Sequence, residues 1–416
     1  MTPERPAPTV VLLGTLDTKG AEYAFVRTQV ERTGCRVLMV NAGILGDPDY
    51  PVDFGRREVA AAAGADIDEL VAAGDRGPAV TAMADGAGVI VEHLLEAGRL
   101  DGILGMGGSG GSSIIAAAMR RLPVGVPKML VSTMASGDTR PYVDTADIAM
   151  TYSVVDIAGV NRISARILGN AAAGIAAMAA AHAAREEERD TRPLVGATMY
   201  GTTTPCVDGA RRWLEARGYE VLVFHATGTG GRSMERLMVS GYVTAALDVT
   251  TTELADEVAG GRLTAGPDRL EAAGSLGLPQ VVSLGAVDQI TFSPPDTVPE
   301  AYRTRTLYRH NPTVTLVRTN EEESDRLGRT IAAKLNAADG PVSLFVPLRG
   351  TSSYAVEGAV FYDPTADAAL FAALREEVGD RVDLVEMDTH INDPAFAEAM
   401  ARRLDAHYRT WSAERR

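Results

Sequence analysis

The sequence predicts an α/β protein of two Rossmann-like, doubly wound domains, whose mainly parallel sheets face each other across a cleft. Two observations support this fold class. Short apolar runs alternate with longer helical segments along the chain, which is typical of parallel sheets with right-handed crossovers. In addition, one apolar run is followed directly by a glycine-rich turn that opens a helix, and ligands bind at such strand ends in open α/β sheets.

The first unit begins with a strand at residues 9–13, a turn at 14–20 and a helix at 22–32 that Gly34 stops. A second strand follows at 36–40. We expect residues 53–100 to form a helical insertion, divided by glycines at positions 64, 74 and 77. The remaining predicted elements are strands at 102–106, 128–132 and 147–150, and helices between 161 and 184.

A charged run ending in Pro193 predicts a linker over residues 186–193, between an N-terminal domain (1–185) and a C-terminal domain (194–416). Residues 27–40 and 211–224 share Arg, Glu, Gly, Val and Leu at the same offsets, which suggests a duplicated fold. The predicted elements of the second domain are strands at 194–200, 218–225, 280–284, 313–317, 342–346 and 382–387, and helices at 208–217 and 394–407.

The bulk composition is that of an ordinary soluble protein, with 46% hydrophobic and 23% charged residues in a chain of 416. A net charge of -15 argues against nucleic acid and anionic membranes as partners, so local donors must hold any bound phosphate. Two cysteines in separate halves suggest a reducing cytoplasm. The first residues do not resemble a signal peptide, and the Ala-rich segment 171–184 is too short to span a bilayer.

The glycine-rich segment at residues 105–113 is the strongest functional signal. Its glycines let the backbone approach an anion closely, and the N–H groups at the start of the following helix favour negative charge. The spacing matches neither a P-loop nor the dinucleotide fingerprint. A tight turn for helix–sheet packing is the alternative. We favour phosphate binding, because the serines add hydroxyl donors where packing alone would accept alanine.

Neighbouring loops at 14–20, 41–46 and 132–138 are also rich in glycine and hydroxyl groups. Lys19 could neutralise a phosphate or lie on the surface. Asp17 could bind a ribose hydroxyl or a magnesium-bound water, or simply cap the following helix. The candidate nucleotide-binding residues are Gly14, Thr15, Asp17, Lys19, Gly107, Gly108, Ser109, Gly110, Gly111, Ser112, Ser132 and Thr133.

Polar residues also gather in the loops of the second half. His310 and His390 are candidate acid–base residues, and Arg349 suits a carboxylate or phosphate. Each histidine taken alone is more often a hydrogen-bonded structural residue. Asp288, Glu253 and a histidine could bind a metal, but their spacing is no recognised ligand signature, and we predict no protein-bound metal site. The candidate substrate-binding residues are Thr202, Asn311, Ser352 and Asn392.

Segments 14–20, 107–111, 127–138 and 154–161 resemble the N-terminal part of the ATP-binding domain family of the tomato mosaic virus resistance protein. Segments 248–254, 310–312 and 390–396 resemble its C-terminal part. The resemblance covers nearly the whole chain and implies two Rossmann-like domains, ATP binding and dimer formation. It places nucleotide binding on residues 107–111. Serine stands at position 112, where the family pattern has threonine, and this retains the hydroxyl.

These observations predict an ATP-binding protein that holds the triphosphate on loop 105–113, with ATP as ligand or regulator and magnesium as an optional companion. The alternative is a metabolic enzyme of hydrolase or lyase type that acts on a small organic acid or phosphorylated metabolite in the interdomain cleft. A purely structural protein would leave the glycine loop unexplained. A Rossmann dehydrogenase is disfavoured, because Asn41 stands where an acidic residue would follow the second strand. We expect a cytoplasmic homodimer or higher homo-oligomer.

Overall fold

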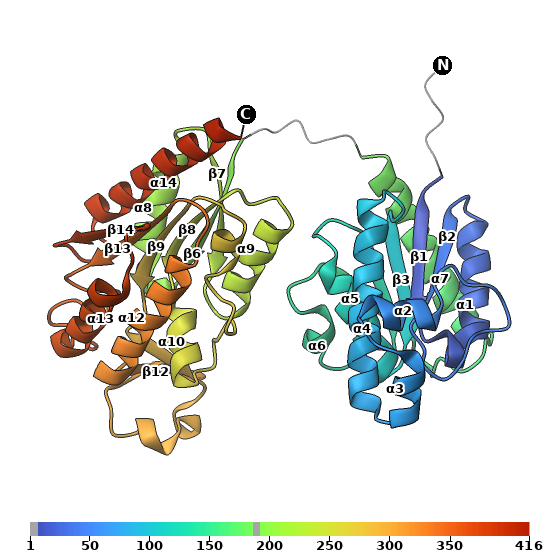
Figure 1. Cartoon of the computed structure of the whole chain (residues 1–416). Helices are drawn as coiled ribbons and strands as arrows, with labels where there is room; N and C mark the ends of the chain where they lie inside the picture. The colour runs from blue at the N-terminus through green and yellow to red at the C-terminus, as the bar shows by residue number, and fades with distance from the viewer. Residues whose placement is uncertain (1–6, 186–191, 416) are drawn as a thin grey trace. The chain divides into compact units, whose positions relative to one another are not determined.

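The computed structural model describes residues 7–185 and 192–415, and the chain separates into two compact units, Met1–Glu188 and Arg189–Arg416 (Figure 1). Most of the predicted linker, residues 186–191, lies outside the described residues. Each unit is a parallel sheet covered by helices on both faces, so the predicted doubly wound α/β fold class is confirmed.

The N-terminal sheet has the order β2-β1-β3-β4-β5 with parallel neighbours. In this flavodoxin-like order the chain reverses its winding direction between β1 and β3, and ligands bind at such a switch point. The strands are β1 (Thr9–Gly14), β2 (Arg36–Asn41), β3 (Gly102–Gly107), β4 (Lys128–Ser132) and β5 (Ile148–Tyr152). The helices are α1 (Leu16–Glu31), α2 (Arg56–Ala62), α3 (Ile67–Ala73), α4 (Arg76–Glu96), α5 (Ser109–Arg121), α6 (Arg140–Val143) and α7 (Ser164–Ala183).

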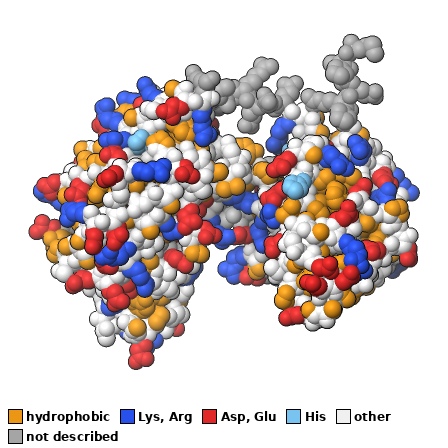
Figure 2. Space-filling view, in the orientation of Figure 1, with side chains coloured by type: hydrophobic (Ala, Val, Ile, Leu, Met, Phe, Trp, Pro, Cys, Tyr) orange, Lys and Arg blue, Asp and Glu red, His pale blue; other side chains and the backbone are white. Residues whose placement is uncertain are grey.

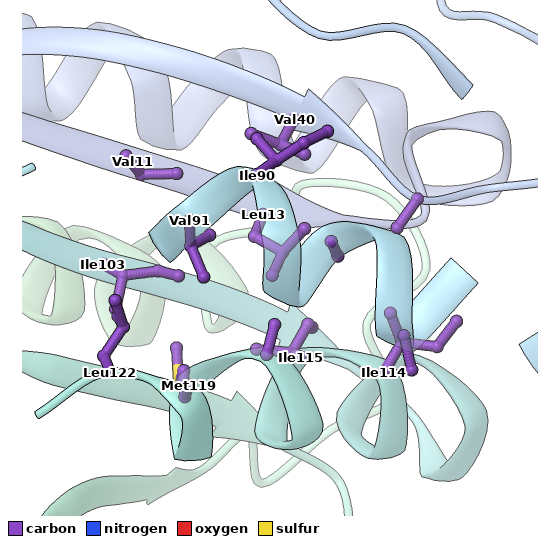
Figure 3. Close-up of a cluster of buried hydrophobic side chains, with 14 of the residues drawn as sticks. Val11, Leu13, Val40, Ile90, Val91, Ile103, Ile114, Ile115, Met119 and Leu122 are labelled. Carbon is purple, nitrogen blue, oxygen red and sulfur yellow. The ribbon is translucent and has the colours of Figure 1, made fainter. Parts of the chain in front are cut away.

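Alternating residues of β1 enter two separate cores. Val11 and Leu13 face α4 and α5, where they meet Ile90 and Ile115 (Figure 3). Val10 and Leu12 instead pack on the opposite face, against α1 and α7. This period-2 alternation with both faces apolar is what a central parallel strand requires. It fixes the carboxyl ends of the strands, from which the site is built.

Two local predictions in this domain are wrong. The expected turn at 14–20 is already helical from Leu16, with a kink at Lys19 (φ −131°, ψ 27°). A tertiary contact overrides the turn signals here, because the Leu16 amide donates to Asn41 Oδ1 at 3.1 Å. Gly77 does not divide the helical insertion. It lies in the first turn of α4, where Asp75 Oδ1 accepts from its amide at 3.1 Å.

The C-terminal sheet has the order β14-β13-β9-β8-β6-β7, which repeats the N-terminal strand order and adds a sixth strand. Its strands are β6 (Leu194–Met199), β7 (Glu220–His225), β8 (Ala245–Thr250), β9 (Gln280–Gly285), β13 (Val342–Pro347) and β14 (Val382–Met387). Its helices are α8 (Thr204–Glu215), α9 (Thr229–Val239), α10 (Thr252–Ala259), α11 (Ala272–Ser275), α12 (Glu321–Asn336), α13 (Pro364–Glu377) and α14 (Pro394–Glu414). The suggested duplication is therefore visible as one topology used twice.

A small antiparallel sheet of order β10-β12-β11 is inserted between β9 and β13, and this sheet was not predicted from the sequence. Its strands are β10 (Gln289–Phe292), β11 (Leu307–Asn311) and β12 (Val314–Arg318). The strand predicted at 313–317 belongs to this insertion and not to the parallel sheet. His310 and Asn311 consequently lie on its mostly exposed outer strand.

Acidic and basic side chains are interspersed over the visible face of both units (Figure 2). Within the described ranges, no helix combines the length and apolar character needed to cross a membrane.

Candidate functional site

A cavity of about 560 Å³ opens at the carboxyl ends of the first strands of the N-terminal sheet. Its walls come from the loops after β1, β2 and β3 and from the corner between α3 and α4. It therefore lies at the switch point between β1 and β3, where open α/β sheets bind ligands, and its volume is typical of ligand pockets. Of the residues predicted to bind nucleotide, the cavity is lined by Thr15, Asp17, Lys19, Gly108, Ser109, Gly110 and Gly111.

The start of α5 forms the polar end of this cavity. Gly108 is the N-cap residue and has no side chain with which to cap the helix. The Ser112 amide donates to the Gly108 carbonyl at 2.8 Å, which is the first bond of the helix. The preceding amides of residues 109–111 have no acceptor within the helix, as at any helix N-terminus. Together with the helix dipole, they create a local site for an anion.

Arg76 is a further candidate residue of this site that was not predicted from the sequence. It begins α4 directly after the corner at Gly74, whose φ of 63° allows the sharp turn from α3. A Cβ on Gly110 would stand only 2.7 Å from Arg76 Nη2, so the guanidinium lies against the glycine loop. Among the described residues, Arg76 has neither an ion-pair partner nor a hydrogen-bond acceptor. An unneutralised cation thus stands beside unpaired amides.

The loops after β1 and β2 are joined by two side chains. Asn41 is fully buried, and its Oδ1 accepts from the amides of Leu16 (3.1 Å) and Gly43 (3.0 Å). Asp17 Oδ2 accepts from the Leu45 amide at 2.9 Å. Asp17 Oδ1 is buried against Gly43 and has no hydrogen-bond partner among the described residues. Asp17 therefore does not act as the N-cap of α1, which begins after Thr15.

Lys19 lines the cavity, but its ammonium group is already engaged. Lys19 Nζ donates to the Ile157 carbonyl at 2.6 Å, which ties α1 to the loop before α7. A bound phosphate would have to share this donor. Lys19 is therefore a weaker candidate for phosphate binding than Arg76.

The other predicted nucleotide-binding residues do not line the cavity. Gly14 makes room for Tyr23, whose hydroxyl donates to the Leu13 carbonyl at 2.6 Å, and burial raises the pKa of Tyr23. Ser112 and Ser132 are fully buried and bond to each other, with their Oγ atoms 2.7 Å apart. Gly107 packs against the backbone of Gly111, and Thr133 Oγ1 lies 3.8 Å from where a Cβ on Gly108 would stand. These five residues therefore pack around the glycine-rich loop and support it, and they do not line the cavity.

In the C-terminal domain, three of the four predicted substrate-binding residues belong to one network, in which Thr202 and Ser352 are buried and Asn392 is half-buried. The Thr202 carbonyl accepts from Asn392 Nδ2 at 2.9 Å and from the Ser353 amide at 3.1 Å. Ser352 Oγ donates to Asp288 Oδ2 at 2.8 Å. These contacts join the loops after β6, β9, β13 and β14. Asn311 lies apart, where its Oδ1 accepts from the Thr313 amide at 2.8 Å.

The three predicted catalytic residues do not converge. Arg349 and His390 line one cavity of about 570 Å³, but Arg349 is paired with Asp388, with Nη2 2.6 Å from Oδ2. His390 Nδ1 accepts from the Asn392 amide at 3.1 Å. His310 does not line this cavity. It is exposed on β11, with its Nδ1 3.5 Å from the Tyr354 hydroxyl.

Asp248 and Glu253 are occupied by a buried ion cluster. Arg269 is 1% exposed, and its guanidinium contacts a carboxylate oxygen of Asp248 and one of Glu253 at 2.6 Å each. Burial opposes the charge of Arg269, but these carboxylates raise its pKa well above the usual value. No group of three or more metal-ligating side chains is assembled in the described part of the chain.

Two parallel α/β domains of one strand order, the first with an open cavity at its switch point, define a two-domain Rossmann-like protein with a candidate anion-binding site. The chain belongs to the uncharacterised protein family UPF0261, whose N-terminal domain matches residues 8–184 and whose C-terminal domain matches residues 192–408.

A UPF0261 protein of Clostridium tetani is 50% identical over 396 residues, which are 95% of this chain and 98% of that protein. The tomato mosaic virus resistance protein Tm-1(GCR237) of Solanum lycopersicum is 39% identical over 330 residues, which are 78% of this chain and 44% of that protein. This bears out the resemblance to the tomato protein, while ATP binding stays a prediction. A crystal structure of UDP-GlcNAc 2-epimerase from Methanocaldococcus jannaschii aligns at 8% identity and a TM-score of 0.22, covering 66% of this chain and 83% of that one.

Proposed function

We propose that the N-terminal domain binds a nucleoside triphosphate of the ATP class, with the phosphates at the N-terminus of α5 and ATP acting as ligand or regulator. One observation carries the proposal. A helix that starts without a side-chain cap opens into a cavity of about 560 Å³, where the guanidinium of Arg76 has no acidic partner among the described residues. An anion of several charges satisfies both groups at once.

The polar groups that line the cavity would then contact different parts of the nucleotide. The amides of residues 109–111 donate to phosphate oxygens, and Arg76 neutralises their charge. Asp17 Oδ1, which is buried without a donor, takes a ribose hydroxyl or a water bound to magnesium. Magnesium is usually held by one or two carboxylates together with substrate phosphates, and Asp17 fits that pattern. Because the chain carries a net charge of -15, these local donors have to overcome the field of the whole molecule.

Calorimetry with ATP on the full chain, with and without magnesium, tests the proposal. Charged hydrogen bonds contribute about 1.5–3 kcal/mol, so Arg76→Ala should weaken ATP binding by roughly 10- to 100-fold. Arg36→Ala is the matched control, because Arg36 is exposed at the start of β2, away from the cavity, and should leave binding unchanged. No binding at millimolar ATP, or equal binding by both variants, would refute the proposal.

The metabolic alternative has the support of one observation, the shared cavity of Arg349 and His390. We propose it as a second candidate, in which a small acid exchanges with Asp388 on Arg349. Double substitution of Arg349 and His390 by alanine should then abolish turnover in a screen of small carboxylic and phosphorylated acids. Turnover that survives in this variant would remove both residues from catalysis.

For cellular location and assembly, we propose a cytoplasmic homodimer or higher homo-oligomer. Cys35 and Cys206 are both buried and free, as expected in a reducing compartment. Light scattering after size-exclusion chromatography measures the assembly directly. A monomer at micromolar concentration would refute this part of the proposal.

A further inference from the structure

We infer that the N-terminal cavity recognises the phosphates of its ligand but does not discriminate between nucleobases. The inference rests on the proposed nucleotide binding and deepens it. It comes from an asymmetry of the cavity, in which polar groups gather at one end and apolar side chains at the other. The substrate class that fits is nucleoside triphosphates in general.

The wall opposite the phosphate end is apolar. Helices α3 and α4 and the second turn of α5 supply Leu70, Val71, Ala79, Val80, Met83 and Ile114. Met83, Ala79 and Ile114 are buried, whereas Val71 is 45% exposed at the rim. These side chains can cover the faces of a planar ring, but they offer no hydrogen-bond donor or acceptor to its edge.

The loop after β2 completes this wall, and three of the four amides of residues 42–45 are already used. The Ala42 amide donates to the Gly14 carbonyl at 2.8 Å, and the Gly43 and Leu45 amides donate to Asn41 and Asp17. The Ile44 carbonyl accepts from Arg56 Nη1 at 2.6 Å. These three amides are committed within the fold, so Ile44 is the one residue of 42–45 whose amide has no acceptor among the described residues, and this loop offers few donors to a base edge.

The polar side chains of the cavity belong to the phosphate end or use at least one of their polar atoms within the fold. Thr18 Oγ1 contacts Thr15 Oγ1 at 3.3 Å, and Ser109 lies in the glycine loop itself. Asp75 Oδ1 accepts from the Gly77 amide. Apolar contacts discriminate between similar ligands by about 10- to 200-fold at most, whereas dedicated hydrogen bonds reach about 10⁴-fold or more. A base held mainly by apolar contacts is therefore weakly selected.

The test compares ATP, GTP, UTP and inorganic tripolyphosphate by calorimetry on the full chain. We expect the three nucleotides to bind within about tenfold of one another, and tripolyphosphate to bind at least about tenfold more weakly, because it leaves the wall empty. Val80→Ala should weaken all three nucleotides to the same extent and leave tripolyphosphate unchanged. Val71→Ala at the exposed rim repeats this comparison with little risk to folding.

The outcomes separate this inference from the proposed function. Binding of ATP with a preference above about tenfold over GTP or UTP would overturn base tolerance and leave ATP binding intact. Tripolyphosphate binding as tightly as ATP would show that the apolar wall contributes nothing, which also overturns the inference. Absence of binding by all four compounds would overturn the proposed function and this inference together.

Discussion

The two domains share one strand order, but they differ in what lies at the glycine-rich N-terminus of a helix. In the N-terminal domain, the start of α5 lacks a side-chain cap and faces a cavity. In the C-terminal domain, the glycine-rich start of α9 is filled by Glu253, whose Oε1 accepts from the amides of Gly228 (2.7 Å) and Gly231 (3.1 Å). The second domain supplies its own anion, and Arg269 neutralises it.

The helix that follows the third strand of each domain, β3 or β8, shows the same difference at an equivalent position. Counted from the ends of β3 and β8, Glu253 occupies the place that Gly110 takes in the N-terminal domain. A glycine there leaves Arg76 without a carboxylate, whereas a glutamate reaches the buried Arg269. Glycine-rich loops therefore indicate a ligand site only where no internal carboxylate occupies them.

The first prediction concerns the buried cluster of Arg269, Asp248 and Glu253. Arg269→Met leaves Asp248 and Glu253 buried without their partner, and breaking a buried ion pair from one side costs about 3–5 kcal/mol. Denaturant unfolding of the full chain should show this loss in the C-terminal domain. Arg375→Met, in an exposed pair with Glu386, is the control and should change little. Equal unfolding midpoints for the two variants would contradict the role given to the cluster.

The next prediction concerns a substitution that gives the start of α5 an internal carboxylate, as Glu253 gives to the start of α9. Gly110→Glu places a carboxylate beside Arg76, and only the mobile end of Arg76 has to move to make room. The internal anion should compete with phosphate and weaken ATP binding by about 100-fold, equivalent to about 2.7 kcal/mol. Gly110→Gln, with the same shape and no charge, should weaken it less. If glutamate and glutamine act alike, sterics and not charge control access to the loop.

The parallel strands of both domains could be predicted from sequence, because they are short apolar runs between glycines and helical segments. Of the antiparallel insertion only β12 was predicted, because the alternating β10 (Gln289–Phe292) has just four residues and β11 (Leu307–Asn311) ends in three polar ones. Their strand character depends on pairing with β12.

The candidate site was predictable only in part. The glycine loop shows in the sequence because its residues are contiguous. Arg76 does not, since its contact with Gly110 spans 34 residues and depends on how α4 folds back over α5. Likewise, nothing in the local sequence connects Arg269 to Glu253, the candidate metal ligand that this buried pairing engages.

The contact between α10 and β10 should make the stability of the C-terminal domain sensitive to pH. Burial raises the pKa of Asp256 to about 8, although its Oδ1 accepts from the Thr291 amide at 2.7 Å. The folded protein then keeps a proton that the unfolded chain releases near pH 4, so the free energy of unfolding falls as pH rises from about 4 to about 8, by up to about 1.4 kcal/mol per unit. Urea unfolding of wild type and Asp256→Asn across this range measures it. The asparagine variant should have a smaller slope, and equal slopes would assign the pH dependence to other groups.

The smallest expected effect concerns the hydroxyl groups of Ser112 and Ser132, beneath the loop at 105–113. It tests whether these groups support the loop or contact its ligand. Ser112→Ala removes the buried bond to Ser132, whose Oγ still accepts from the Met134 amide at 3.0 Å, so the loss in stability should be about 1 kcal/mol. Because Ser112 lies beneath the cavity, the ATP dissociation constant should change by less than about twofold. Ser113→Ala, at an exposed hydroxyl bonded to the Ser109 carbonyl, is the control for any change in the helix start. A tenfold loss of affinity in Ser112→Ala without such a loss in Ser113→Ala would show that Ser112 contacts phosphate directly.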